Sequence, residues 1–142
     1  KELSLIGPST GRWVPEIMKE NNPEDISYYP FMNGQFVFKN AVVRFTEVIN
    51  AGLKKAGWKP TEIDMLIPHQ ANLRIAQFVQ KKFGLSDNQV YNNIQRYGNT
   101  TAASIPIALT EAWEEGKIEK GNKVVLAAFG SGFTWGSIMI QW

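Results

Sequence analysis

Cysteine is absent from the 142 residues of this chain. This absence excludes a disulfide, a thiolate metal site and a cysteine nucleophile within the polypeptide. A strong charge of one sign is also missing, because fifteen Lys and Arg stand against thirteen Asp and Glu and leave a formal net charge of +2. So small an imbalance gives no support to nucleic acid as a partner.

Long apolar runs are missing as well. No stretch reaches the roughly 20 apolar residues of a membrane-spanning helix, and the amino terminus lacks a basic region followed by an apolar segment. We therefore expect no membrane association and a cytoplasmic location. The apolar content of 44% is ordinary for a folded core, and the length suits a single domain.

Turn-forming residues dominate the first 34 positions, where prolines, glycines and paired asparagines recur. We interpret residues 1–34 as a linker or loop region and residues 35–142 as the core of the domain. Aromatic residues inside the linker favour a packed loop, and they are Trp13, Tyr28, Tyr29 and Phe31.

Regular elements follow the linker. Segments with helical periodicity end at glycines, and they cover residues 38–53, 71–83 and 102–115. Apolar runs bounded by turn residues predict strands, at 3–6, 63–67, 90–91, 123–129 and 133–141. This alternation predicts an α/β fold with a mixed, mostly parallel five-stranded sheet, helices on both faces and a carboxyl-terminal antiparallel hairpin.

Pro106 is the discordant residue of the third helix. If Ser104 caps that helix, Pro106 lies in the first turn, where its missing amide hydrogen costs nothing. If Thr100 or Thr101 is the cap, we expect a kink instead.

Polar groups follow three of the predicted strands. The only histidine, His69, comes directly after the run at 63–67, Asn99 follows the run at 90–91, and a glycine-rich turn at 130–132 follows the run at 123–129. Ligands bind at the carboxyl ends of parallel strands, and amides in a glycine-rich turn can point together at an oxyanion. Each group also has an ordinary alternative role, as a helix cap, a turn residue or a hairpin. Together they predict a site at one sheet edge.

Three motifs resemble the β-ketoacyl-acyl carrier protein synthase III family in residue type, order and spacing. They are IPHQANLRI at 67–75, YGNTTAAS at 97–104 and AFGSGFTWG at 128–136. The resemblance extends over 32–142, while 1–31 matches more loosely the segment that joins the two halves of such enzymes. It implies that the chain is a single thiolase-like domain, the carboxyl-terminal half of a condensing enzyme.

The resemblance also implies an activity, the decarboxylative condensation of an acyl group from acyl-CoA with malonyl-acyl carrier protein in fatty acid biosynthesis. In that family a Cys on the amino-terminal half accepts the acyl group, and the positions of His69 and Asn99 bind the malonyl substrate. The backbone amide of Ser131 matches the family's second oxyanion hole. Coenzyme A thioester is then a substrate, no cofactor or metal is implied, and the full enzyme is expected to be a homodimer.

Further residues take roles by the same resemblance. Those that line the pantetheine tunnel or acyl pocket in relatives are Gly34, Phe38, Ala71, Asn72 and Phe129. Aromatic residues are often buried, so Phe38 and Phe129 have ordinary core packing as an equal alternative.

A basic patch for docking the acidic carrier protein is implied at Lys39, Arg74, Lys81 and Lys82. Such a patch would act mainly on the rate of encounter and its salt dependence. A solvated helix face is the alternative for any one of these residues.

Without a Cys the chain alone is expected to be inactive, because Ser and Thr are poor substitutes for a thiolate. Three alternatives stay open at this point. In the first, the chain is a non-catalytic module that binds acyl carrier protein or coenzyme A. In the second, it belongs to a synthase III-like enzyme of a specialised, polyketide-type pathway. In the third, it is an unrelated α/β domain with similar turns.

Overall fold

The structure is a computed structural model that describes residues 3–4 and 31–142. The chain divides into two units, with the boundary between Lys39 and Asn40. In the first unit, β1 (Leu3–Ser4) pairs antiparallel with β2 (Phe31–Met32). The predicted packed loop with its aromatic residues lies almost entirely outside the described residues.

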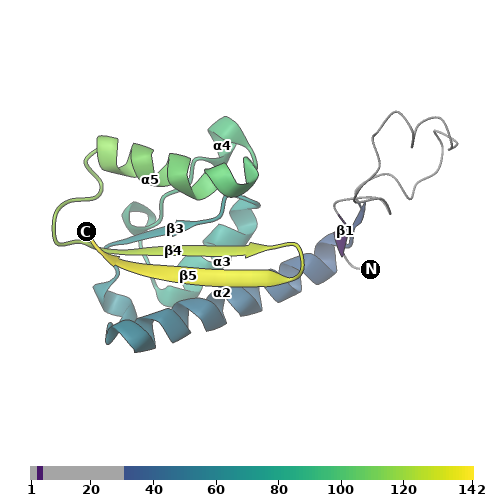
Figure 1. Ribbon diagram of the computed structural model, residues 1–142, viewed down its shortest axis with the longest axis horizontal. Helices are drawn as coiled ribbons and strands as arrows, with labels where there is room; N and C mark the ends of the chain where they lie inside the picture. Colours follow the sequence, from purple (N-terminus) through teal and green to yellow (C-terminus); the bar gives the residue numbers. More distant parts are fainter. Residues whose placement is uncertain (1–2, 5–30) are drawn as a thin grey trace, which may run out of the picture. The chain divides into compact units, whose positions relative to one another are not determined.

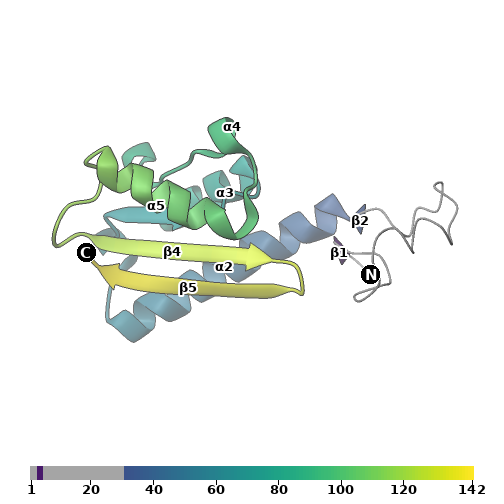
Figure 2. The same ribbon diagram turned by 45° about the horizontal axis from the view of Figure 1, so that its top comes forward.

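The second unit is built on a three-stranded sheet in the order β3-β4-β5 (Figure 1). Its strands are β3 (Met65–Pro68), β4 (Lys123–Gly130) and β5 (Thr134–Gln141). The first two run parallel, with Pro68 opposite Ala127, and β5 returns antiparallel beside β4, with Thr134 opposite Gly130 (Figure 2). The predicted carboxyl-terminal hairpin is confirmed.

The predicted five-stranded, mostly parallel sheet is wrong, because the sheet of the second unit has three strands in the described residues. The run at 90–91 contributes only one parallel bridge, between Val90 and Leu66. Beyond it the Gln70 side chain, instead of a neighbouring strand, accepts the backbone N–H groups of Asn93 and Ile94. The Gln70 side chain thus bonds the backbone N–H groups that a neighbouring strand would have bonded, and the pairing of strands ends at Val90. The run at 3–6 contributes β1, which pairs with β2 and not with this sheet.

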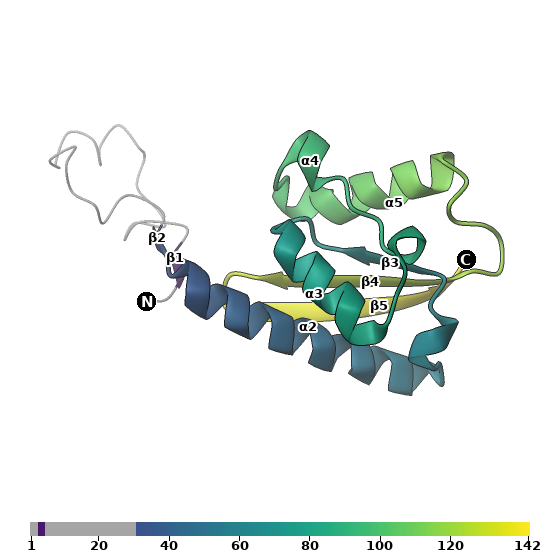
Figure 3. The same ribbon diagram turned by 180° about the vertical axis from the view of Figure 1, so that it is seen from behind.

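Helices cover both faces of the sheet, as predicted. The helices are α2 (Gly34–Ala56), α3 (Leu73–Phe83), α4 (Ile94–Tyr97) and α5 (Ser104–Glu114). Helix α5 lies on one face, and α3 lies on the other together with the part of α2 that follows Asn40 (Figures 1 and 3). Single 3₁₀ turns at Pro60–Glu62, Asp87–Gln89 and Thr101–Ala103 join these elements.

The predicted helix ends are set by local chemistry. The helix predicted from residue 71 begins at Leu73, because the Asn72 side chain caps it by accepting the N–H of Arg74. It ends at Gly84, whose φ of 66° is the left-handed conformation that glycine adopts most readily. The third predicted helix divides into the 3₁₀ turn Thr101–Ala103 and α5.

Pro106 is the third residue of α5 and lies in its first turn, so its missing N–H is not needed there. This agrees with the first of the two alternatives for the start of the helix. Ser104 opens the helix without capping it, however, because its hydroxyl contacts His69. Because α5 begins at Ser104, a start of the α-helix at Thr100 or Thr101 is excluded.

Two apolar layers hold the second unit together. Alternate strand residues pack with Ala108 and Ala112 of α5, and they are Met65, Ile67, Val124 and Leu126. The intervening strand residues are also buried, on the face covered by α2 and α3. Because both faces are covered, β3 is apolar throughout and β4 is apolar after Lys123, and a fully buried aliphatic side chain contributes about 1.5–3 kcal/mol.

Among the helices of the described residues, none is both long and apolar enough to cross a membrane.

Helix α2 lies so close to β5 that a glycine is required at their contact. The Ser137 hydroxyl donates a hydrogen bond to the Val48 carbonyl over 2.8 Å, and a Cβ atom on Gly52 would come 2.8 Å from the same hydroxyl oxygen and still closer to the Met139 side chain. The helix can pack here only while position 52 has no side chain.

We therefore expect Gly52→Val to lower the free energy of unfolding by about 1–3 kcal/mol through overpacking. Urea unfolding followed by circular dichroism would measure the change. Ala51→Val, at the neighbouring exposed position, is the matched control for the cost of a branched residue in the helix. Equal stability of the two variants would contradict the close contact.

Candidate active site

His69 stands at the carboxyl end of β3, in the turn before α3. Its backbone N–H donates to the Ala127 carbonyl over 2.8 Å, which extends the ladder between β3 and β4 by one residue. The imidazole Nδ1 lies 2.6 Å from the Ser104 hydroxyl oxygen. The ring is half-buried, and this loss of hydration lowers the pKa of His69. The imidazole is therefore neutral near pH 7.

Ser104 decides which imidazole nitrogen carries the hydrogen. Its hydroxyl oxygen accepts the backbone N–H of Gln70 over 3.3 Å, and the residue is only 2% exposed. A buried hydroxyl needs an acceptor for its own hydrogen, and Nδ1 of His69 stands at hydrogen-bonding distance. With Nδ1 accepting, the imidazole hydrogen resides on Nε2, which becomes a donor.

Asn99 follows Gly98 in an exposed turn. Its side-chain oxygen accepts the backbone N–H of Thr101 over 2.9 Å, which orients the carboxamide. The amide nitrogen of Asn99 has no hydrogen-bond acceptor within the part of the chain that the structure describes. Thr101 has a φ of 52°, a value rare for a branched residue, so the turn is held in a costly conformation. Asn99 is thus both a turn residue and a free donor.

The segments that carry His69 and Asn99 meet at one place. The 3₁₀ turn Thr101–Ala103 leads directly from Asn99 to Ser104, and Ser104 contacts His69. The start of α5 therefore docks the Asn99 turn against the carboxyl ends of β3 and β4.

The sequence did not reveal the role of Gln70. This side chain is 3% exposed, and its amide nitrogen donates to the carbonyls of Pro68 and Tyr91 over 2.8 and 3.3 Å. Its oxygen accepts the N–H groups of Asn93 and Ile94 over 3.1 and 3.2 Å. All four bonds go to backbone groups, so Gln70 fastens the end of β3 to the chain that leads toward Asn99. The sequence signal that could have pointed to this role is the position of Gln70 directly after the only histidine, where a predicted strand ends.

The glycine-rich turn closes the hairpin between β4 and β5. Because β4 is parallel to β3, this turn lies beyond the same sheet edge as His69. The Ser131 carbonyl accepts the Thr134 hydroxyl over 3.0 Å, and Phe129 is buried with its ring 4.9 Å from that of Phe133. This packing favours a core role for Phe129, and the proposed donor role of the Ser131 amide stays a prediction.

The other predicted substrate-binding residues fall into two groups. Ala71 and Asn72 are exposed in the turn between His69 and α3, and the Ala71 N–H donates to the His69 carbonyl over 2.9 Å. Gly34, the first residue of α2, and the partly buried Phe38 belong to the first unit. Their roles stay predictions.

The predicted docking residues of α3 are exposed together. Arg74, Lys81 and Lys82 lie away from the buried face of this helix, and Phe78, 44% exposed, stands four residues from Arg74 and from Lys82. Lys39 is exposed on the first unit. The structure thus gives α3 a basic outer face with one aromatic residue in it.

The sheet with a carboxyl-terminal hairpin, helices on both faces and polar groups at the strand ends has the architecture of the thiolase-like α/β proteins. The chain belongs to the 3-oxoacyl-[acyl-carrier-protein] synthase III family, whose carboxyl-terminal model matches residues 53–142. The resemblance carried by the three motifs is confirmed.

Individual relatives agree with this assignment. The β-ketoacyl-[acyl-carrier-protein] synthase III of Desulfotalea psychrophila is 51% identical over 111 residues, which cover 78% of this chain and 34% of the relative. The synthase III of Bartonella henselae is 42% identical, over 99% of this chain and 44% of the relative. The solved synthase III of Thermus thermophilus superposes with a TM-score of 0.83 at 37% identity, over 99% of this chain and 41% of that chain. The chain thus spans less than half of the length of these relatives.

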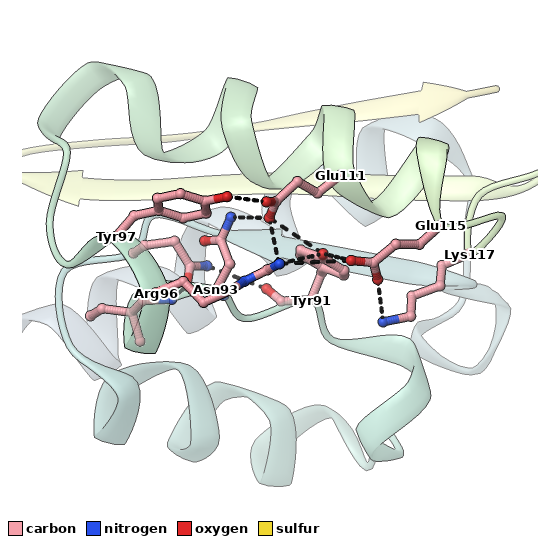
Figure 4. A network of polar contacts seen from close by, with 9 residues as sticks. Tyr91, Asn93, Arg96, Tyr97, Glu111, Glu115 and Lys117 are labelled. Atoms are coloured by element: carbon pink, nitrogen blue, oxygen red, sulfur yellow. Dashed lines mark hydrogen bonds and ion pairs between the residues drawn. The ribbon is translucent and has the colours of Figure 1, made fainter.

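A second polar cluster adjoins the site, between α5 and the segment 91–97 (Figure 4). We name it the Glu111 cluster, and its members are Tyr91, Asn93, Arg96, Tyr97, Glu111, Glu115 and Lys117. The Glu111 carboxylate accepts hydrogen bonds from Asn93 and Arg96, both over 2.7 Å, and from the Tyr97 hydroxyl. Glu115 accepts the Tyr91 hydroxyl over 2.7 Å and pairs with Lys117 at 2.7 Å.

These contacts change the acidity of the cluster. The Tyr97 hydroxyl, followed by Asn93, lowers the pKa of Glu111, and Lys117, followed by Tyr91, lowers the pKa of Glu115. Burial, followed by the bond to Glu115, raises the pKa of Tyr91 to about 12. The cluster therefore favours ionised carboxylates and a protonated Tyr91 near neutral pH.

A carboxyl group with a lowered pKa in the folded state stabilises the fold above its unfolded-state pKa, and this contribution is lost as the pH falls through the folded-state value. We expect the free energy of unfolding to decrease below the ordinary carboxyl pKa of 4.5, and Glu111→Gln to make that decrease shallower. Urea titrations across the acid range measure both slopes. Glu114→Gln removes a carboxylate from the same helix outside the cluster, and an equal change in slope from this control would contradict the role of the cluster.

Proposed function

We propose that this chain is the carboxyl-terminal part of an enzyme that condenses an acyl group with malonyl-acyl carrier protein, with loss of carbon dioxide, in fatty acid biosynthesis. One observation carries the proposal. Ser104 holds Nδ1 of the His69 ring and so leaves Nε2 as the donor, and Thr101 holds the oxygen of the Asn99 carboxamide and leaves its nitrogen as a donor, in segments that the start of α5 joins. The names of the relatives support the same activity.

Two such donors suit the decarboxylation of a malonyl thioester. When the terminal carboxylate leaves as carbon dioxide, the bonding electrons move onto the thioester and form an enolate. The Nε2 hydrogen of His69 and the amide of Asn99 would both donate to the enolate oxygen and stabilise its negative charge. A carboxylate at either position would repel that charge.

The condensation step requires a second half of the enzyme. The enolate carbon attacks the carbonyl carbon of an acyl group held as a thioester on a Cys of the amino-terminal half. A carbon–carbon bond forms, the carbon–sulfur bond breaks, and the Cys leaves as thiolate. The backbone N–H of Ser131 would donate to the oxyanion of the tetrahedral intermediate.

The neutral state of His69 matters for this role. A cationic imidazole would carry a hydrogen on Nδ1 as well and would lose its acceptor role toward the Ser104 hydroxyl. It would also protonate the enolate carbon or oxygen before condensation. Burial of the ring, which lowers the pKa of His69, favours the neutral donor.

Substrates and partners follow from this proposal. Acyl-CoA supplies the acyl group, and malonyl-acyl carrier protein supplies the extender. Ala71 and Asn72, with Gly34, Phe38 and Phe129, would line the path of the pantetheine arm or the acyl pocket. A cytoplasmic homodimer of the full enzyme completes the proposal.

We expect His69→Ala and Asn99→Ala to lower the rate of malonyl decarboxylation by about 10²–10³-fold each, because each removes one donor to the enolate oxygen. The variants are made in the full-length enzyme, with this chain joined to a Cys-bearing amino-terminal half. Carbon dioxide release measures decarboxylation, and mass spectrometry measures acylation of the Cys, which we expect to be unchanged.

Asn50→Ala, at an exposed position of α2, is the control for removal of an asparagine. Equal losses in acylation and decarboxylation would contradict the assigned roles. Full activity of this chain alone would contradict the need for the Cys-bearing half.

The basic outer face of α3 suits an acidic carrier protein. Arg74, Lys81 and Lys82, with Lys39, would attract the carrier, and the exposed Phe78 offers an apolar contact between the charges. Charges of this kind act mainly on the rate of encounter, and salt screens them.

Arg74→Glu is accordingly expected to raise the KM for malonyl-acyl carrier protein about tenfold at low ionic strength, which corresponds to roughly 1.4 kcal/mol. The difference should shrink as salt is added, while the maximal rate stays close to that of the unmodified enzyme. Lys120→Glu reverses an exposed charge away from α3 and is the control. A KM that rises equally at every salt concentration would argue against electrostatic docking.

A further inference from the structure

Asn99 lies two residues beyond the end of helix α4 (Ile94–Tyr97), and this helix is too short to be stable by itself. It is a single turn of four residues, none of which is buried. Isolated helical turns of this length are unstable, since nucleation costs more than one or two hydrogen bonds return. The position of Asn99 must therefore depend on contacts that α4 makes with other elements.

Those contacts converge on one carboxylate. Asn93, directly before α4, and Arg96, within it, donate to one oxygen of Glu111, each over 2.7 Å. The Tyr97 hydroxyl donates to the other oxygen. Figure 4 shows the three side chains pointing from the α4 segment toward Glu111 on α5. Both carboxylate oxygens are thus used to hold the residues that immediately precede Gly98 and Asn99.

Gln70 binds the main chain of the same segment. Its oxygen accepts the N–H groups of Asn93 and Ile94, and its own backbone follows His69 directly. Asn93 therefore contacts Gln70 through its main chain and Glu111 through its side chain. The start of α4 is thus fixed through both the main chain and the side chain of Asn93.

Helix α5 links the two donors of the proposed site. Ser104, in its first turn, contacts His69, and Glu111 lies seven residues later on the same side of the helix. One rigid helix thus touches the His69 ring with one residue and the support of Asn99 with another. Its geometry sets how far apart the two donors stand.

We propose that Glu111 is a positioning residue for Asn99, holding α4 so that the Asn99 amide and the His69 ring reach the same enolate oxygen. The inference rests on the proposed function of His69 and Asn99. Thr101 orients the Asn99 carboxamide within its turn, and Glu111 holds the preceding helix that sets where this turn lies.

The requirement is for a carboxylate. A carboxylate offers acceptors on both oxygens to the three donors from Asn93, Arg96 and Tyr97. A glutamine would turn an NH₂ group toward one of those donors and would leave the Arg96 guanidinium without its ion pair at 2.7 Å. Glu115 does not substitute for it, because its nearest oxygen is 3.7 Å from Arg96 and its bonds go to Tyr91 and Lys117.

The test uses the full-length enzyme and compares Glu111→Gln with Glu114→Gln, which changes a neighbouring carboxylate that makes none of these contacts. We expect Glu111→Gln to lower the kcat for decarboxylation of malonyl-acyl carrier protein by about 10- to 100-fold, as displacement of a catalytic group by about 1 Å does. Acylation of the Cys and the KM for malonyl-acyl carrier protein should stay unchanged.

A double-mutant cycle separates positioning from general structural support. In an Asn99→Ala background the group that Glu111 positions is gone, so Glu111→Gln should cost less than about twofold more. If the two losses multiply instead, Glu111 acts independently of Asn99 and the inference is overturned. Tyr97→Phe, which removes one hydrogen bond and no charge, gives the same readout should Glu111→Gln fail to fold.

Failure of the inference and failure of the proposed function give different results. If Asn99→Ala itself leaves decarboxylation intact, the proposed function fails, whatever Glu111→Gln does. If Asn99→Ala has its full effect but Glu111→Gln has none, or lowers acylation and decarboxylation alike, only the positioning role is overturned.

Discussion

The contact between Nδ1 of His69 and the Ser104 hydroxyl is the interaction on which the arrangement of this site depends. It joins the carboxyl end of β3 to the first turn of α5, the helix that covers this face of the sheet. Because Ser104 also accepts the Gln70 amide, the same oxygen fixes both the ring and the turn that carries it. Gln70 makes a second link between the end of β3 and the Asn99 segment, through the N–H groups of Asn93 and Ile94.

Around this contact, two polar side chains bind groups that the helices and strands leave without backbone partners. Gln70 satisfies four backbone groups at a place where the sheet ends early, and Glu111 satisfies three side-chain donors beside a helix of one turn. Polar groups withdrawn from water are costly unless they are paired, so the buried Gln70 and the partly buried Glu111 both favour one arrangement over its alternatives. The price is that each becomes sensitive to the loss of a single partner.

The chain also shows how the chemistry of this family is divided. Its described residues place His69 and a glycine-rich hairpin at one sheet edge, with the Asn99 turn leading directly to Ser104, while the sequence contains no thiol. One helix, α5, and one buried glutamine, Gln70, hold the segments that carry His69 and Asn99. The match to the carboxyl-terminal region of 3-oxoacyl-[acyl-carrier-protein] synthase III fits that division.

The sequence by itself determined the features that depend on near neighbours. Periodicity and terminal glycines such as Gly84 located the helices, apolar runs located β3, β4 and β5, and motif order pointed to His69, Asn99 and the family. Only the tertiary structure decided that the run at 90–91 stops after one bridge, that Ser104 contacts His69 instead of capping α5, and that Gln70 and Glu111 bind the segment before Asn99. Most of these features rest on hydrogen bonds between residues 14 to 35 positions apart. Such pairing leaves no periodic trace in the chain, because it depends on how packed helices and strands bring distant segments together.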